Sequence, residues 1–346
     1  MFENELSNLV DVCRESRTDD IVKRLGVITS NRVHLKRYPL DNPVVVFNPS
    51  MIIKQGIVIL YARITLGYYT YASTVAELRI PLEDVYDSLT LGNYAAEIKI
   101  FPDNKFDICG IEDPRVYEID GKRYMTYCGR TVDYFDPTTR IERTLPTTAV
   151  LEGDNWRKMG VFRMPPKIRE SVVSDKNAFL VKTKDGLKFF HRLHTKEDAS
   201  YAVISNVPDG ILNSEGFNEV NLNDTMLAIE SEKCEDKIGW GPPPVKIGKE
   251  YVFLLHGLDK RTKHYRVFAM LTNEKLEITA ISPSYIMGPK EIYEIFGDRP
   301  FVVFPCGAQK IDDKILISYG AADLAIGIGE IDTSELMSIL DSNRID

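Results

Sequence analysis

The sequence predicts an all-β protein: a five-bladed β-propeller with an N-terminal helical extension and a short C-terminal helix. The main observation is a repeat, because five apolar runs that each follow a turn recur along the 346 residues. Each run closes at a Tyr or a His, and these markers are Tyr61, Tyr127, His191, His256 and Tyr319. Their successive separations are 66, 64, 65 and 63 residues. A fixed period of this kind is typical of repeat architectures.

A second element recurs about thirteen or fourteen residues before each marker. Its five copies are Phe47-Asn48-Pro49, Glu112-Asp113-Pro114, Lys176-Asn177-Ala178, Gly241-Pro242-Pro243 and Phe304-Pro305-Cys306. Each unit is therefore interpreted as a strand, a tight turn, a second strand and a longer return. Such units must stack on like neighbours to bury their faces, and radial stacking gives a propeller. We predict one catalytic domain over residues 31–346.

Both ends of the chain are predicted to be helical. Between residues 4 and 25, apolar side chains fall at helical spacing at Leu6, Leu9, Val10 and Cys13, and again at Ile21, Val22 and Leu25. This extension, residues 1–30, is expected to pack on the outside of the propeller or on another subunit, which leaves a homo-oligomer open. The tail from Asp332 to Leu340 predicts a short helix with Thr333 or Ser334 as its N-cap.

Composition and charge narrow the range of partners. A formal net charge of −8 repels polyphosphate backbones and argues against nucleic acid. No run approaches the ~18 apolar residues of a membrane span, and the first residues carry charges rather than the apolar core of a secretory signal. The five cysteines are scattered without a CxxC pair, as expected for reduced thiols. We expect a cytoplasmic protein that does not contact membranes.

The sequence gives no indication of a metal or a bound cofactor. His191 and His194 are three residues apart, which on a strand places them on opposite faces. The glycines of IGIGE (residues 326–330) neither open a helix nor follow a strand as in a dinucleotide-binding turn. We therefore expect the chemistry of the site to come from the side chains of the protein, without a metal ion or a bound cofactor.

Equivalent positions of a propeller converge on its axis, so the repeat itself points to a site. The turn column reads Asn48, Asp113, Asn177, Pro242 and Pro305, and one member is acidic. A carboxyl group in a partly dry funnel is suited to act as a general acid, which makes Asp113 the catalytic candidate. The same residue before proline also fits an ordinary turn.

Basic residues and hydrogen-bond donors gather near the same axis. Arg63 lies two residues after one marker, Lys176 precedes Asn177, and two markers are the histidines His191 and His256. Such a set suits an anion such as phosphate. The alternatives are a strand histidine with satisfied hydrogen bonds and a surface ion pair. Asp323, at the end of a unit, fits either a sugar-binding residue or a turn.

Several motifs in a fixed order carry a resemblance to a known family. They are GIEDPRV at 110–116, KNAFLV at 176–181, GPPPVKIG at 241–248 with LLHGLD at 254–259, and VFPCGAQ at 303–309 with ISYGAADLAIGIGEID at 317–332. Together they resemble glycoside hydrolase family 130, the β-mannoside phosphorylases and related β-mannosidases. The similarity runs from about Asn42 to Leu340.

The resemblance implies a five-bladed propeller that cleaves a β-mannosidic bond with inversion. It implies Asp113 as the acid, which delivers its proton through the 3-hydroxyl of the mannose that is cleaved. It implies phosphate binding by Arg63, Lys176, Asn177 and His256. It implies substrate binding by Asn48, Ser50, Arg115, His191 and Asp323, with aromatic stacking by Tyr265.

Two enzymatic activities and one binding function fit this resemblance. An inverting hydrolase needs a second carboxylate to activate water, whereas a phosphorylase replaces it with an anion clamp. Because the clamp positions are filled, we expect reversible phosphorolysis of a β-mannobiose, a β-mannooligosaccharide or a mannosyl-glucose or mannosyl-N-acetylglucosamine to α-mannose 1-phosphate, with inorganic phosphate as co-substrate. Glu230, Glu232 and Glu235 stand where family members have a Trp-Glu pair, which keeps a β-mannosidase open. The third alternative is a non-catalytic carbohydrate-binding propeller.

Overall fold

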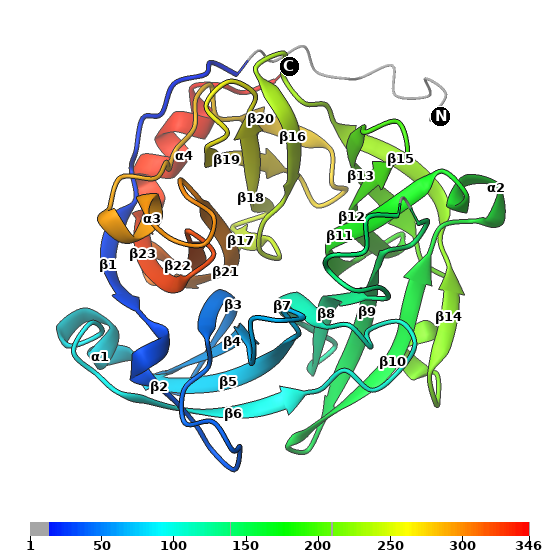
Figure 1. Cartoon of the computed structure of the whole chain (residues 1–346). Coiled ribbons are helices and arrows are strands. Elements are labelled where there is room, and N and C mark those ends of the chain that lie inside the picture. The colour runs from blue at the N-terminus through cyan, green and yellow to red at the C-terminus, as the bar shows by residue number, and fades with distance from the viewer. Residues whose placement is uncertain (1–13, 139, 209, 346) are drawn as a thin grey trace.

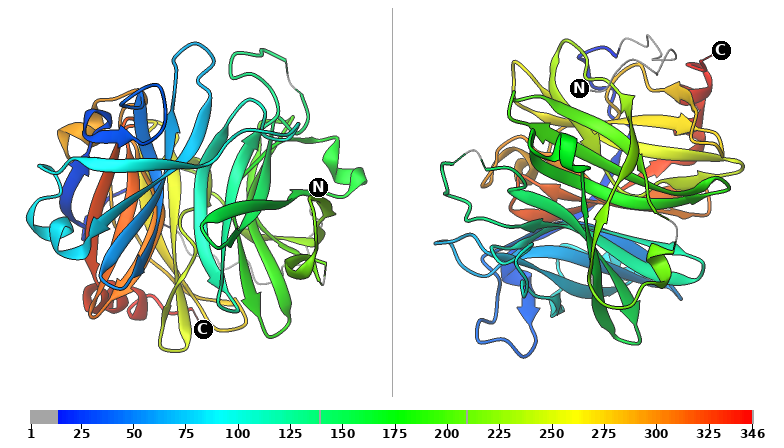
Figure 2. Two further views of the ribbon diagram at one scale, coloured as in Figure 1. Left: turned by 90° about the horizontal axis from the view of Figure 1, so that it is seen from below. Right: turned by 90° about the vertical axis from the view of Figure 1, so that its right-hand side faces the viewer.

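Strands make up most of the regular structure, and the prediction of an all-β protein is confirmed. The computed structural model describes residues 14–138, 140–208 and 210–345. Four sheets stand around a common centre (Figure 1). In the side views the strands run between two faces of the molecule, and the connecting loops lie at those faces (Figure 2). No helix in the described ranges has the length and apolar character needed to cross a membrane.

The first sheet holds early strands of the described chain, and the last sheet holds both its first and its final strand. The first has the order β2 (Val33–Leu35), β6 (Tyr94–Ile100), β5 (Ser73–Pro81), β4 (Ile57–Thr65) and β3 (Val45–Lys54). The last has the order β1 (Lys23–Ile28), β23 (Ala325–Asp332), β22 (Lys314–Ala321) and β21 (Val303–Ile311). Strand β1 thus joins the beginning of the described chain to its final sheet.

The middle of the chain forms a nine-stranded and a five-stranded sheet. The nine strands are β7 (Ile111–Ile119), β8 (Lys122–Arg130), β9 (Thr144–Glu152), β10 (Asn155–Arg163), β11 (Val172–Thr183), β12 (Gly186–Thr195), β13 (Ser200–Asn206), β14 (Asn218–Asn221) and β15 (Asn223–Ile229). Its two parts meet where β9 pairs with β11 through Thr144 and Ser174. The five strands are β16 (Glu235–Trp240), β17 (Val245–Ile247), β18 (Glu250–Asp259), β19 (Tyr265–Thr272) and β20 (Ile278–Ile281).

Helices are few and short. They are α1 (Leu82–Asp87), α2 (Pro166–Arg169), α3 (Ile292–Ile295) and α4 (Thr333–Asp341), with 3₁₀ turns η1 (Ser30–Arg32) and η2 (Ile211–Asn213). The predicted C-terminal helix is confirmed as α4, which buries Leu336 and Leu340. Its N-cap is Asp332 rather than Thr333 or Ser334, because the Asp332 carboxylate accepts the backbone N–H groups of residues 334 and 335.

The second part of the predicted N-terminal helix is wrong. Residues 23–28 form strand β1, which pairs antiparallel with β23, and the preceding residues from Arg14 onward are irregular. Val22 and Ile28 are buried there, so pairing with the free edge of β23 outweighs a helical spacing that rested on three apolar residues. The first part, residues 4–13, lies outside the described residues.

The recurring turn is a bulge at the same place in successive hairpins. The pairing register shifts between Phe47 and Ser50 in β3, between Glu112 and Arg115 in β7, and between Lys176 and Phe179 in β11. A fourth shift lies in β21 between residues 305 and 307, and in the remaining unit the strand is interrupted between β16 and β17. A β-bulge re-aims side chains that regular alternation would send to the other face.

Aromatic side chains fill the space between neighbouring sheets. The ring of Phe190 in β12 lies 5.2 Å from that of its cross-strand partner Phe179 in β11 and 5.2 Å from that of Phe253 in β18 of the next sheet. The ring centroids of Trp240 and Phe190 lie 4.9 Å apart in an edge-to-face arrangement. All four rings are buried, so the strands that carry them are covered on both faces, as their continuous apolar runs predict.

Candidate active site

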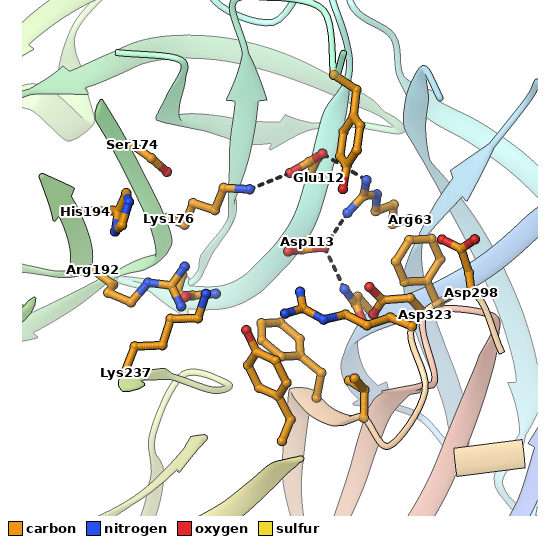
Figure 3. A pocket seen from close by; sticks show the side chains of 18 of the residues that line it. Arg63, Glu112, Asp113, Ser174, Lys176, Arg192, His194, Lys237, Asp298 and Asp323 are labelled. Carbon is orange, nitrogen blue, oxygen red and sulfur yellow. Dashed lines mark hydrogen bonds and ion pairs between the residues drawn. The ribbon is translucent and has the colours of Figure 1, made fainter. Parts of the chain in front are cut away.

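A polar cavity of about 270 Å³ opens at the centre of the sheets (Figure 3). Its wall takes side chains from the first hairpin of the chain, from both parts of the nine-stranded sheet, from β16 and from the turn between β22 and β23. Residues far apart in the sequence therefore meet there, as the repeat predicts.

The bulges supply the side chains at the centre of this cavity. Asn48, Asp113 and Asn177 occupy equivalent positions and have φ angles of +46°, +48° and +55°. Asn and Asp tolerate this left-handed conformation better than most residues, because their short polar side chains bond locally. All three residues line the cavity. The sequence column thus corresponds to a backbone feature that turns polar groups inward.

Asp113 lies between two donors. Its Oδ1 accepts hydrogen bonds from Asn48 Nδ2 at 2.7 Å and from Arg63 Nη1 at 3.2 Å. The side chain is 11% exposed, so it is shielded from bulk water but open to a molecule in the cavity. This placement suits a proton donor that a substrate hydroxyl can reach.

Glu112, next to Asp113, holds the surrounding cations. Its carboxylate is buried and pairs with Arg63 Nη2 at 2.9 Å, Arg130 Nη1 at 3.2 Å and Lys176 Nζ at 3.0 Å. Burial alone favours the neutral acid, but the charges of Arg63, Lys176 and Arg130 hold the pKa of Glu112 well below its usual range. Glu112 and Arg130 were not among the predicted site residues, although Glu112 adjoins Asp113 in the same motif.

A second group of basic residues lines the cavity without contacting Glu112. Arg192 of β12, Lys237 of β16 and Arg299, which follows α3, line the cavity. Within the described ranges, none of the three has a carboxylate oxygen within 4.0 Å. Figure 3 shows Arg192 and Lys237 with Lys176 on one side of Asp113, and Asp298 and Asp323 on the other.

Arg192 is buried and Lys237 is half-buried, so both charges are partly desolvated, whereas Arg299 is exposed. Burial lowers the pKa of Arg192 and, helped by the neighbouring charges of Arg192 and Arg299, lowers the pKa of Lys237. Buried charges without a counter-charge cost free energy, so their grouping favours a site that binds an anion. The sequence did not single out any of these three residues.

Asp323 is the second carboxyl group beside Asp113. It lies in the turn between β22 and β23 with a φ angle of +50°. Burial raises the pKa of Asp323 to about 6; the charge of Arg63 opposes this shift and that of Asp113 adds to it. A carboxyl group with this pKa is able to donate or accept hydrogen bonds near neutral pH.

The structure brings seven of the predicted site residues to the cavity and leaves four outside its wall. Those that line it are Asn48, Arg63, Asp113, Lys176, Asn177, Tyr265 and Asp323. Tyr265 stands between Lys237 and Arg299, whose charged groups lie 6.0 Å and 4.8 Å from its ring.

Ser50 and Arg115 support the bulges from behind. The Val116 backbone N–H donates to Ser50 Oγ at 2.8 Å, which links β3 to β7. Arg115 is fully buried and donates to the carbonyl oxygens of Gly241 at 2.6 Å and Asp113 at 3.0 Å. Neither side chain lines the cavity, so both hold the strands that carry the site.

The two marker histidines are buried behind the cavity wall. His191 Nδ1 lies 2.9 Å from Asp175 Oδ2 and its Nε2 lies 2.8 Å from Ser205 Oγ, which matches the alternative of a satisfied strand histidine. His256 packs on Phe304 with ring centroids 4.4 Å apart. Burial, and then the positive charges of Arg192 and Arg115, hold the pKa of His256 well below its usual range.

His256 nevertheless approaches the cavity across Gly239. A Cβ added at Gly239 would come within 2.6 Å of His256 Nε2 and within 2.9 Å of Asn177 Oδ1. Neither the His256 ring nitrogens nor the Asn177 amide has a hydrogen-bond partner in the described chain. The absence of a side chain at residue 239 therefore keeps two unpaired polar groups close to the site.

The glutamates considered as hydrolytic bases lie away from the cavity. Glu235 is buried, pairs with Arg14 Nη2 at 2.6 Å and accepts the Tyr285 hydroxyl. Glu232 accepts the Arg14 backbone N–H at 3.1 Å. Neither these two nor Glu230 lines the cavity. The segment therefore binds Arg14 and does not provide a base beside Asp113.

One shielded acid opposite a cluster of unpaired cations is typical of an enzyme that transfers a group between a polar substrate and an anion. The comparison with known families agrees with this class. The chain belongs to glycoside hydrolase family 130, because the family model, described as β-1,4-mannooligosaccharide phosphorylase, matches residues 13–342.

The chain is similar to curated relatives in sequence and to a solved structure in fold. A β-1,2-mannobiose phosphorylase of Thermoanaerobacter sp. (strain X514) is 27% identical over 232 residues, which are 66% of this chain and 68% of that protein. A β-1,2-mannobiose phosphorylase of Listeria innocua is 24% identical over 289 residues, 81% of this chain and 73% of that protein. The structure of a Listeria innocua β-1,2-mannobiose phosphorylase with β-1,2-mannobiose has a TM-score of 0.70 and 17% identity, covers 93% of this chain and 97% of its own, and shares the fold.

Proposed function

We propose that this chain is a β-mannoside phosphorylase. Inorganic phosphate attacks the anomeric carbon of the terminal mannose with inversion and yields α-mannose 1-phosphate and an acceptor shortened by one unit. The reaction runs in reverse when the sugar phosphate accumulates. The observation that carries this proposal is the pair of unpaired cations Arg192 and Lys237, which lie together on one side of Asp113 in the cavity wall.

The proton and the bonds are accounted for by the residues in the cavity. A phosphate oxygen forms a bond to the anomeric carbon while the bond from that carbon to the leaving oxygen breaks. The leaving oxygen takes a proton that comes from Asp113 through the 3-hydroxyl of the mannose. Asn48 and Arg63 fix the Asp113 carboxyl for this transfer, and Asp323 is placed to bind another hydroxyl of the same sugar.

Phosphate is held on the side of Lys176. Lys176 and Asn177 come from the β11 bulge, and Arg192 and Lys237 stand beside them. Cationic donors in a shielded site form the strong hydrogen bonds that phosphate oxygens accept. In this proposal His256 and Arg63 border the phosphate site on its inner side. His256 is included because its ring nitrogens are unpaired and lie near Asn177. No bound cofactor enters the mechanism.

The proposal includes a five-bladed propeller in one domain. The sequence placed the start of this domain at residue 31, but β1 (Lys23–Ile28) pairs with β23 in the last sheet and is therefore counted with it. The nine-stranded sheet is counted as two blades, since β9 and β11 join its two parts through one pair of residues. A cytoplasmic enzyme accords with this proposal, because the four described cysteines are free thiols.

Hydrolysis is the less favoured alternative. Glu235 and Glu232 are held by Arg14, and no glutamate of that segment lines the cavity. A non-catalytic binding propeller would not need a shielded acid opposite unpaired cations. A hydrolase would release free mannose without phosphate, and a binding propeller would form no product.

The synthetic direction tests the proposal. The protein is incubated with α-mannose 1-phosphate and either mannose, glucose, N-acetylglucosamine or a mannobiose, and released phosphate is measured together with the linkage formed. We expect phosphate release with at least one acceptor, and the linkage then decides between β-1,2 and β-1,4. No release with any of the acceptors, in a protein that binds mannobiose, would contradict the proposal.

A further inference from the structure

A mainly apolar groove lies between the nine-stranded and the five-stranded sheets, away from the central cavity. It has a volume of about 900 Å³ and is called the outer groove here. Its lining includes Phe190 of β12, Trp240 of β16 and Met270 of β19. β15 and β20, which end the strand orders of the two sheets, contribute Leu227 and Ile278. The outer groove shares no lining residue with the candidate active site.

The lining of the outer groove brings the largest hydrophobic cluster of the described chain to the surface. Phe190, Trp240 and Met270 are buried members of this cluster, and half-buried Leu227 packs against it. Met226, the next lining residue of β15, is 47% exposed. A large apolar surface beside a groove marks a place where another segment or another molecule binds. The outer groove is therefore suited to an apolar partner.

Short helices close two other gaps between neighbouring sheets. α4 packs against β19 and β20 of the five-stranded sheet and against β23 of the last sheet, and it buries Leu336 and Leu340. α1 packs against β5 and β1, and it buries Val85. In both places a helix covers apolar side chains that two sheets leave open between them. Within the described ranges, no helical residue lines the outer groove.

The described chain begins beside the outer groove. Arg14, its first residue, is 3% exposed, and its guanidinium lies 4.0 Å from the centre of the Phe268 ring. Phe268 and Met270 share one face of β19, about 7 Å apart along the strand. Arg14 also pairs with Glu235 at 2.6 Å, in the segment that follows β15. Residues 1–13 are therefore attached next to the groove.

The sequence before residue 14 has the pattern of a helix that could cover such a groove. Leu6, Leu9, Val10 and Cys13 recur at the three- and four-residue spacing that forms one apolar stripe. Leu6 and Val10 are four residues apart, as are the two leucines that α4 buries. A helix over residues 4–13 would be about 15 Å long, which is enough to reach the groove from its attachment.

We propose that residues 4–13 form a helix that covers the outer groove of the same chain. The apolar stripe packs on the groove lining, and Asn4, Asn8 and Asp11 on the opposite side of the helix face solvent. The partner is the N-terminus of the same chain rather than of a second copy, because Arg14 is held beside the groove by a buried ion pair. The inference does not depend on the proposed function.

Matched substitutions in the N-terminal segment test the proposal. L6D combined with L9D places two charges in the apolar stripe, whereas N4D combined with N8D places two charges on the opposite side. We expect the first pair to lower the thermal midpoint of the full chain by about 5 °C, because two leucine side chains lose their burial. We expect the second pair to leave the midpoint unchanged. Scanning calorimetry measures both, and equal midpoints in the two variants would overturn the proposal.

A double-mutant cycle identifies the surface that the segment covers. M226D places a charge in the lining of the groove, so it should lower the thermal midpoint of the wild type but have little further effect when L6D and L9D are present. Ile292 on α3 is exposed and does not line the groove, and I292D should have the same effect in both backgrounds. Additive losses from M226D and the two leucine substitutions would overturn the proposal.

The dependence on protein concentration distinguishes the segment of the same chain from that of a second copy. For the same chain, the shift caused by L6D and L9D should stay constant over about a hundredfold range of protein concentration. The mass measured by light scattering should be the same in this variant and in the wild type. A shift that grows with protein concentration, or a mass that falls when the leucines are replaced, would assign the groove to the N-terminus of another copy and overturn the proposal.

Discussion

Two groups of basic residues around the cavity differ in how their charges are balanced. Arg63, Arg130 and Lys176 share the buried carboxylate of Glu112, whereas Arg192 and Lys237 have no carboxylate partner within the described ranges. Charges that are already paired hold a structure in place. Charges without a partner are available to a ligand, so Arg192 and Lys237 are assigned to phosphate and Arg63 and Arg130 to positioning the acid, while Lys176 pairs with Glu112 and also lies beside the proposed phosphate site.

The largest expected effect concerns the proposed general acid, Asp113, which lies near both groups of basic residues. D113N should lower the rate of phosphorolysis by about a thousandfold, because a positioned general acid contributes on the order of 10²- to 10⁴-fold. Steady-state rates with saturating phosphate measure it. The thermal midpoint should stay near that of the wild type, since the carboxamide keeps the size of the side chain. A D113N protein with wild-type activity would show that Asp113 is not the general acid.

The next contrast concerns stability. R130M should lower the free energy of unfolding by about 1.5–3 kcal/mol, the cost of losing one hydrogen bond to a charged group, because Glu112 keeps its pairs with Arg63 and Lys176. R192M removes a buried charge that has no carboxylate partner and should leave the free energy of unfolding equal or higher. Denaturant titrations of the two variants check this. An equal loss of unfolding free energy in the two variants would show that the paired and the unpaired group contribute alike to stability.

A third experiment addresses ligand binding. R192A and K237A should each raise the KM for phosphate by about 10- to 100-fold, the effect of losing one hydrogen bond to a charged group. The KM for the mannoside should change less, because these residues lie across Asp113 from Asp323. Initial rates at varied phosphate and fixed mannoside separate the two constants. A change confined to the mannoside KM would assign these cations to the sugar.

The smallest expected effect is a dependence of stability on pH. The folded-state pKa of Asp323 is raised from 3.8 to about 6, so the native chain holds this proton more tightly than the unfolded chain does. Stability from this group is therefore present below pH 4 and is lost as the pH rises from about 4 to about 6. The difference in unfolding free energy between D323N and the wild type, followed across that range, should show this slope. A difference independent of pH would contradict the raised pKa.

The sequence repeat predicted the strands and the central residues because both follow from local pattern. Asn48, Asp113 and Asn177 were found since equivalent bulges place them equivalently. Arg192 was missed because it directly follows the marker His191, and neighbouring strand residues point to opposite faces. The marker packs behind the wall, and the next residue faces the cavity.

Other features depended on contacts that no local pattern records. Arg299 lies in a loop outside the repeated unit, so its approach to Tyr265 follows from the tertiary fold. Strand β1 depends on the free edge of β23, which is about 300 residues away in sequence. Long-range pairing of this kind decides between helix and strand when a short segment fits both periods.

The phosphate dependence of cleavage tests the central claim most directly. β-1,2- and β-1,4-mannobiose are incubated with the protein in buffer with and without inorganic phosphate, and the products are resolved by anomeric configuration. The account predicts α-mannose 1-phosphate when phosphate is present and negligible cleavage when it is absent. Free mannose released at the same rate in both buffers would contradict it.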